Sequence, residues 1–160
     1  MPCHVNRYSA TRVTLASYVH VPAQYDLRMN RFNVTTSQHS EMIDITDRVR
    51  QVVSDANVSA DSVMVYVPHT TAGITINENA DPDVVRDVLK QLNEMVPWGQ
   101  PFYRHGEGNS AAHVKASMMG SSVTVLIDAG RLVLGTWQSL WFCEFDGPRT
   151  REVIVQVRGG

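Results

Sequence analysis

The apolar and polar positions of this chain fall into regular periods only from Arg31 onward. Apolar residues at every second position predict strands, and apolar residues three and four positions apart predict helices with one buried face. This pattern predicts strands over residues 32–36, 62–67, 73–77, 122–127, 131–134, 140–145 and 153–157. It predicts helices over residues 45–56, 82–96 and 109–119.

The order of these elements predicts an α+β fold. The last four strands follow one another through short connections, which favour antiparallel pairing because parallel crossovers need much longer ones. We therefore expect a mixed or antiparallel sheet with about three helices packed on it. The length of 160 residues suits a single compact domain.

Residues 1–30 show neither period, so we expect an N-terminal extension outside the core and a domain over residues 31–160. Met29 stands just before the regular pattern begins, and we hypothesise that it is the native start. Mass spectrometry of the protein from its native host tests this hypothesis.

Local signals also mark the helix ends. Asp81 followed by Pro82 predicts a helix start, because the aspartate accepts from free backbone amides and proline gives up no hydrogen bond there. Asn57 and Gly120 stand where the first and third helices are expected to end.

Composition narrows the classes of function. Hydrophobic residues make up 43% and charged residues 19% of the chain, and the net charge is −2. These values give no reason to expect a nucleic-acid partner. No apolar run reaches the roughly 20 residues that a membrane span needs. We therefore expect no membrane partner. The two cysteines form no disulfide framework and match no zinc motif, which fits a reducing compartment, so we expect a cytoplasmic protein.

Three histidines are the first candidates for chemistry. Three imidazoles can bind a divalent metal and leave one position open for water or substrate. His69 follows a predicted strand, His105 precedes a glycine-rich loop, and His113 stands one turn into a predicted helix. The set predicts a metal site if the fold brings the three places together. Taken singly, a histidine in such a place is more often a hydrogen-bonded structural or surface residue.

A second candidate is an anion-binding loop. The run Gly106-Glu107-Gly108-Asn109 leads into the third helix, where glycines allow close backbone approach and the helix N-terminus is partially positive. The alternative is a turn that ends with Asn109 as a helix cap. Lys115 is one of only two lysines, so it is a candidate for holding phosphate, although a solvated lysine is the usual case.

Polar side chains also gather after the strand at residues 73–77. Asn77 and Asn79 are candidates for binding a substrate, and carboxylates here could do acid–base work or hold a cation. Glu78 and Asp81 are the candidate catalytic carboxylates, with helix capping as the alternative role of Asp81.

The pair Trp137-Gln138 suits a wall that stacks on a flat ligand and bonds to it through an amide. Burial at a subunit contact explains the tryptophan equally well. Cys143 stands in an apolar strand with no adjacent base, so we interpret it as an inert buried thiol.

These motifs resemble the YjbQ family, also called UPF0047. The resemblance is carried by EMIDIT (41–46), HTTAGITINENADP (69–82), GEGNSAAHVKAS (106–117), GTWQ (135–138) and FCEFDGPR (142–149). It implies a homotrimer with a histidine-rich pocket that can hold a metal, with His69, His105 and His113 as its histidines. Ser139 departs from the family, which commonly has glycine there.

The family is also known as secondary thiamine-phosphate synthase. This implies coupling of hydroxymethylpyrimidine diphosphate to a thiazole phosphate, with release of pyrophosphate. In that reaction the 106–109 loop and Lys115 would hold phosphate, and Trp137 with Gln138 would face the pyrimidine. Three histidines suit zinc or another transition metal, whereas a diphosphate suits magnesium.

Two other functions stay open at this point. One is a metal-dependent hydrolase or lyase acting on a small phosphorylated or carbonyl substrate. The other is a non-catalytic trimeric protein that binds a small ligand.

Overall fold

The computed structural model describes residues 28–59 and 61–159. The strands are β1 (Arg28–Thr35), β2 (Glu41–Asp44), β3 (Asp61–Tyr66), β4 (Ala72–Glu78), β5 (Ser122–Asp128), β6 (Arg131–Leu132), β7 (Gln138–Glu144) and β8 (Thr150–Gly159). The helices are α1 (Thr46–Ala56), α2 (Pro82–Met95) and α3 (Ser110–Met119). β1 begins three residues before the predicted start of the domain, and the rest of the predicted extension lies outside the described residues.

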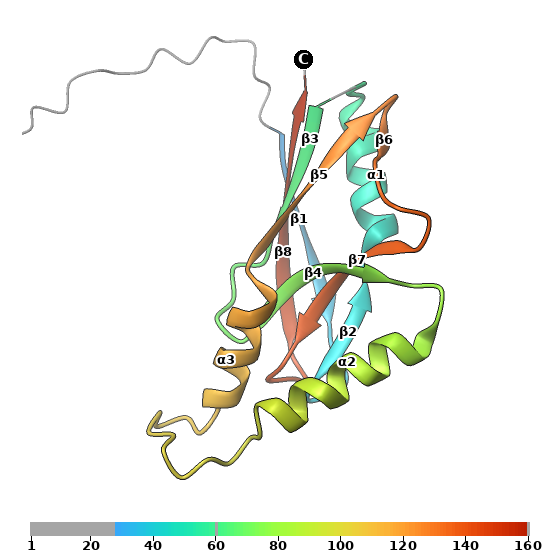
Figure 1. The fold of residues 1–160 in the computed structure, drawn as a ribbon. Helices are drawn as coiled ribbons and strands as arrows, with labels where there is room; N and C mark the ends of the chain where they lie inside the picture. The colour runs from blue at the N-terminus through green and yellow to red at the C-terminus, as the bar shows by residue number, and fades with distance from the viewer. Residues whose placement is uncertain (1–27, 60, 160) are drawn as a thin grey trace, which may run out of the picture.

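Two antiparallel sheets form the fold, which confirms the α+β class and the expected strand direction (Figure 1). The larger sheet has the order β1-β8-β3-β5-β6, and the smaller has the order β2-β7-β4. The expectation of a single sheet is wrong. Of the last four strands only β5 and β6 pair with each other, because β7 joins the small sheet and β8 inserts between β1 and β3.

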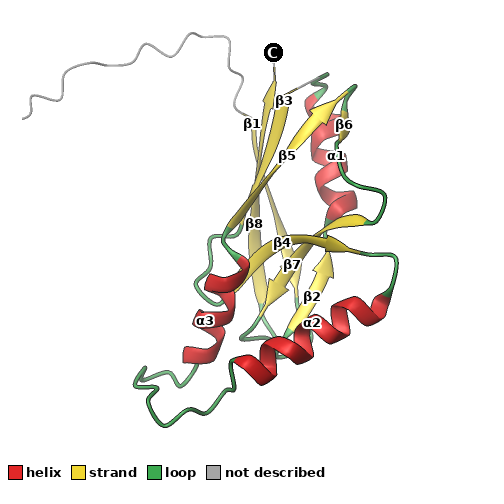
Figure 2. Ribbon diagram, in the orientation of Figure 1, coloured by secondary structure: helices red, strands yellow, loops and turns green. Residues whose placement is uncertain are grey.

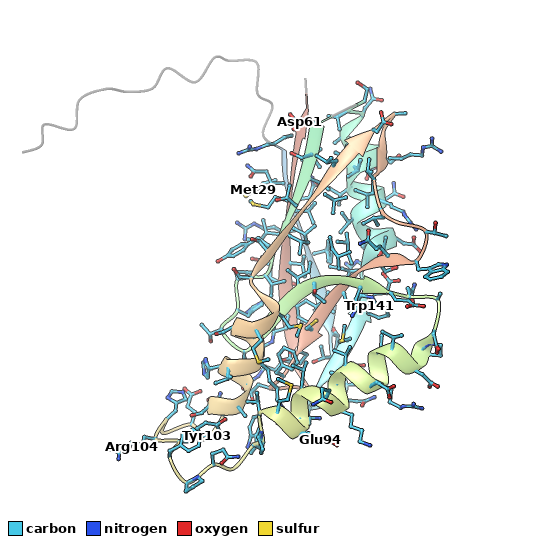
Figure 3. The ribbon with its side chains drawn as sticks, viewed as in Figure 1. Met29, Asp61, Glu94, Tyr103, Arg104 and Trp141 are labelled. Atoms are coloured by element: carbon cyan, nitrogen blue, oxygen red, sulfur yellow. The ribbon has the colours of Figure 1, made fainter. Side chains whose placement is uncertain are left out.

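The sequence of β7 explains why it lies at the centre of the small sheet. All of its residues after Gln138 are buried, so both of its faces are covered. Leu140 and Phe142 point into a core shared with the large sheet and α1. Trp141 and Cys143 point into a second core beneath α2 and α3, where Figure 3 shows Trp141. A strand that is buried on both faces has a continuous run of apolar residues, rather than apolar and polar residues in alternation.

The helices are arranged around these two cores. Figure 2 shows α1 beside the upper half of the large sheet and α2 below the small sheet. Asp81 caps α2 as predicted, since its Oδ1 accepts from the Asp83 amide at 2.9 Å. Asn57 ends α1 in the left-handed conformation, with φ 51°. In the last turn of α2, Met95 is 58% exposed, whereas Leu92 and Val96 are buried.

The outer face of the large sheet carries apolar side chains that the described chain leaves exposed. Met64 and Tyr66 on β3 and Leu126 on β5 are 38%, 39% and 63% exposed, whereas Val63 and Val65, which alternate with them, are fully buried. This face is therefore a candidate contact surface. Within residues 28–59 and 61–159, no helix is both long and apolar enough to cross a membrane.

Candidate functional site

The two histidine-bearing stretches meet at the start of β4. His69 lies in the loop between β3 and β4, His113 lies on α3, and both line one pocket of about 410 Å³, here called the histidine pocket. Thr70, Ala72, Ala116, Ser117, Gly120 and Ser121 complete its lining. Gly73 allows this meeting, because a Cβ there would lie only 2.7 Å from the carbonyl oxygen of Gly120 at the end of α3.

His69 is tied to the neighbouring strand β8. Its Nε2 lies 2.9 Å from the amide nitrogen and 3.1 Å from the carbonyl oxygen of Glu152, so the ring has a backbone partner in either tautomer. Burial, aided by the positive charge of Arg151, lowers the pKa of His69 below its ordinary value. The ring is therefore a neutral imidazole at neutral pH and is ready to accept a proton.

His113 differs because part of its ring has no partner. Its Nε2 is buried without a hydrogen bond from any residue that the structure describes. The ring of His105 meets the ring of His113 edge to face, with centroids 5.1 Å apart. His105 lies in the loop between α2 and α3, directly after Tyr103 and Arg104, which are labelled in Figure 3. A buried polar atom without a partner is costly, so the Nε2 of His113 is suited to a ligand atom.

The donor set of one chain does not fit the predicted three-histidine metal site. Within residues 28–59 and 61–159, no group of three or more histidine, cysteine or acidic side chains is placed to hold a metal ion. The physical reason is that His69 is drawn to the backbone of β8, whereas His105 stays beside His113. The rings of His105 and His113 thus lie side by side, whereas His69 only lines the same pocket as His113.

A buried ion pair fixes the loop that carries His69. The Nε and NH2 atoms of Arg151 each donate to Glu144 at 2.7 Å, and the same NH2 donates to the Thr71 hydroxyl at 2.8 Å. The carbonyl oxygen of Thr71 accepts from the Phe145 amide at 3.1 Å. Glu144 is fully buried and Arg151 is 8% exposed. The position of the loop is therefore set by β7 and β8.

The glycine-rich loop has acidic surroundings. The Asn109 amide group donates to Glu107 at 3.2 Å and to Asp146 at 3.1 Å, and it makes no capping bond to α3. Burial alone would raise the pKa of Asp146, but hydrogen bonds from Asn109 and Arg149 outweigh burial and lower it. Asp146 is therefore ionised at neutral pH. The carboxylates of Glu107, in the loop, and of Asp146, beside it, oppose the binding of an anion there, although Arg149 pairs with Asp146 at 2.7 Å.

Lys115 is neither solvated nor part of the glycine-rich loop. It is only 2% exposed, and its Nζ donates to Oδ1 of Asn93 on α2 at 2.5 Å. Burial lowers the pKa of Lys115. The lysine does not line the histidine pocket. Its described contact is thus to a neutral amide between two helices rather than to a phosphate-binding loop.

The remaining predicted residues lie at the far end of β4. The strand begins with Ala72 opposite Glu144 and ends with Glu78 opposite Gln138, so its ends are about 20 Å apart at ~3.3 Å per residue. Trp137 is 65% exposed at this far end, where its carbonyl oxygen accepts from the Asn79 amide at 2.8 Å. Within one chain the wall expected from Trp137 and Gln138 is therefore not part of the histidine pocket.

The polar side chains there bond mostly to their own surroundings. Oδ1 of Asn77 accepts from the Glu78 amide at 2.8 Å, and Asp81 caps α2. The structure therefore gives Glu78 and Asp81 no contact with the histidine pocket.

A family model described as UPF0047 protein YjbQ-like matches residues 30–160. The chain belongs to the YjbQ family. YugU of Bacillus subtilis is 48% identical over 131 residues, which cover 82% of this chain and 99% of that protein. A UPF0047 protein of Methanocaldococcus jannaschii is 46% identical over 129 residues, which cover 81% and 93%.

Solved YjbQ-family structures share the fold. An uncharacterised family member from Clostridium acetobutylicum is 52% identical, has a TM-score of 0.77, and matches over 79% of this chain and 97% of its own. A YjbQ-like protein of unknown function from Sulfolobus solfataricus is 29% identical, has a TM-score of 0.81, and matches over 85% and 99%. The resemblance found in the sequence is confirmed at the level of family and fold.

Sequence reasoning about this YjbQ-family chain missed the residues that hold the site in place. Glu144 and Arg151 were given no role, although a signal was present. Glu144 is a charge inside the apolar run of β7, and a buried charge requires a partner of opposite sign. The partner was not identifiable from local pattern, because Arg151 lies on a strand of the other sheet.

Proposed function

We propose that the histidine pocket is the catalytic site of an enzyme that acts on a small polar substrate, with His69 and His113 as its acid–base groups. The observation that carries this proposal is the meeting of two imidazoles in one pocket, one of them with a buried Nε2 that lacks a partner among the described residues. His69 has a lowered pKa and suits the role of base, since a neutral imidazole accepts a proton at neutral pH.

The first reaction to test is the coupling of hydroxymethylpyrimidine diphosphate to thiazole phosphate, because the family resemblance suggests it. In this reaction the Nε2 of His113 would bind a polar group of the substrate. The departing pyrophosphate needs positive charge, and no lysine or arginine lines the pocket. Magnesium carried with the diphosphate would supply this charge when bound. A transition metal would require ligands beyond those that one chain gathers.

The same observation favours a second candidate. A pocket lined by two imidazoles, with no carboxylate, lysine or arginine in its lining, suits hydrolysis or elimination on a small carbonyl or phosphorylated substrate. Glu107 and Asp146 lie near the α3 end of this region and disfavour a highly charged anion. A metal-dependent form of this activity requires metal binding in the assembled protein, which elemental analysis of purified protein measures directly.

We also propose that the chain works as a homotrimer through the outer face of the large sheet. Exposed Met64, Tyr66 and Leu126 support this proposal. Tyr66 lies three residues before His69, so a subunit docked on this face would stand beside the histidine pocket. Analytical ultracentrifugation measures the assembly, and Leu126→Glu is expected to dissociate it.

The experiment uses protein from a host that lacks its dedicated thiamine-phosphate synthase. The two substrates are supplied with magnesium, and thiamine phosphate is measured by fluorescence after oxidation. We expect product from the parent, at least about a tenfold loss in His113→Asn, and full activity in the control His39→Asn, an exposed histidine outside the pocket.

The outcomes separate the candidates. Absence of product from the folded parent rejects the coupling reaction, and a panel of phosphate esters and carbonyl compounds then tests hydrolysis and elimination. Equal activity in His113→Asn and the parent rejects the histidine pocket as the catalytic site. A ligand recovered from native protein, with no turnover across the panel, supports a non-catalytic binding protein.

A further inference from the structure

We propose that the surface along α1 carries a second binding site, for a small molecule that joins a flat heteroaromatic ring to a phosphate group. The site is distinct from the histidine pocket, since its ring end is built at the opposite end of β4. Its function does not depend on the reaction proposed for the histidines.

The site consists of two hollows that share one arginine. A hollow of about 390 Å³ lies between α1 and the β5–β6 turn, and Arg50, Ser54 and Arg131 are among its lining residues. A second hollow of about 270 Å³ is lined by Arg50 together with Trp137 and its neighbours. Because Arg50 belongs to both, the hollows adjoin, and we call them together the α1 groove.

The first hollow has the chemistry of a phosphate site. Arg50 comes from α1, and Arg131 comes from the start of β6 after a tight turn in which Gly130 has φ 71°. The side chain of Arg131 has no hydrogen-bond or ion-pair partner within the described chain. Two guanidinium groups line this one hollow and can both donate to a phosphate, and Ser54 adds a hydroxyl donor.

Arg50 is free enough to serve this role. Its one described ion pair is with Asp47 on the same helix, at 2.8 Å, and the two side chains are 56% and 92% exposed. An exposed pair of this kind contributes little to stability, so a phosphate can compete with Asp47 for the guanidinium.

The second hollow has the chemistry of a ring site. Trp137 is 65% exposed, so its indole is available for stacking. Oε1 of Gln138 accepts from the Gly135 amide at 2.8 Å, which orients the side chain and leaves its Nε2 as a free donor. Nδ2 of Asn79 donates to Asp44 at 2.7 Å, which leaves its Oδ1 as a free acceptor.

The charges of the groove orient the ligand. Asp44 and Asp47 line the ring end, where they repel a phosphate, whereas Arg131 lies only at the other end. One donor and one acceptor beside an exposed indole match the edge of a heterocycle that carries both an acceptor and a donor. The ring is thus expected over Trp137 and the phosphate between the two arginines.

The test is calorimetric titration of the full chain with cytidine and adenosine 5′-monophosphates. Inorganic phosphate and the two nucleosides serve as partial ligands. We expect at least one monophosphate to bind more tightly than either of its parts. Arg131→Gln and Trp137→Ala should each raise its Kd by about tenfold or more. Arg86→Gln, an exposed arginine on α2, is the matched control and should bind as the parent does.

Three results would overturn the proposal. One is absence of binding by both monophosphates, and another is binding that Arg131→Gln and Trp137→Ala leave unchanged. The third is loss of assembly in Trp137→Ala without any ligand effect, which would make the tryptophan a subunit contact. His113→Asn should leave this binding unchanged, so failure here and failure of the histidine pocket are distinguishable.

Discussion

Arg151 and Glu144 face each other across the two sheets, with Nε to Oε2 and NH2 to Oε1 both at 2.7 Å in the protein interior. The pair joins β8 of the large sheet to β7 of the small sheet. Through its third bond, to Thr71, it also holds the loop that carries His69. The guanidinium of Arg151 therefore holds the two sheets together and also fixes the position of His69, a candidate catalytic residue.

The first prediction concerns this ion pair. Arg151→Met leaves the carboxylate of Glu144 buried without its counter-ion, so we expect a loss of about 3 kcal/mol or more in the free energy of unfolding, measured by urea denaturation. The double variant Glu144→Gln/Arg151→Met should recover much of the loss. The glutamine is uncharged, and its side-chain oxygen can still accept from the Phe145 and Asp146 amides. An equal loss in the single and double variants would contradict the account.

The second prediction concerns the pH dependence of stability. The pKa of His69 in the folded chain is lowered from its ordinary value of 6.5, mainly by burial. The unfolded chain therefore binds more protons just below pH 6.5, and stability falls as the pH drops from 6.5 towards the folded pKa.

Urea denaturation between pH 7.5 and 5 measures this dependence, and the proton resonances of the His69 ring give its pKa. His69→Gln should flatten the slope, whereas His39→Gln should leave it as in the parent. A His69 ring that titrates above pH 6.5 is incompatible with the described burial.

The third prediction concerns Lys115. Its ammonium is buried against the neutral side chain of Asn93, so the charge lacks a described counter-ion. Burial lowers its pKa from the ordinary value of 10.5, so the stability of the parent should rise with pH between the folded pKa and 10.5. Lys115→Met should abolish this rise and be at least as stable at pH 7. A strongly destabilised Lys115→Met would show that the ammonium is stabilising.

The sequence predicted α1 and α2 well because each has an apolar side, which produces a local period. α3 lacks such a period, since its buried residues are small alanines and Lys115. Asp81, Asn57 and Gly120 mark helix ends through local backbone chemistry, so these too were visible. The separation into two sheets was not, since strand pairing joins residues far apart in the chain. The apolar run of β7 indicates burial on both faces but does not say which strands lie beside it.

The same limit explains the outcome for the site. The sequence drew attention to the stretches that carry His69 and His113, and the structure places these two residues in one pocket. The expected role of Trp137 at that pocket depended on the register of β4 against β7, which places Gln138 opposite Glu78 at the far end. Whether Trp137 reaches the pocket depends on how β4 and β7 pair, and this pairing is set by the assembled sheet rather than by the local sequence.

The last prediction concerns Cys143. The thiol is fully buried on β7, and burial raises its pKa to about 12. Its Sγ has a backbone contact, to the Trp141 carbonyl oxygen at 3.4 Å. Because the thiolate is the reactive form, we expect a Cys3→Ser variant to show no reaction with a disulfide reagent at pH 8. The same variant should react completely in 8 M urea, which serves as the control. Rapid labelling without urea would mean that β7 separates from α2 and α3 in solution, and the second core would then be far less stable than its packing indicates.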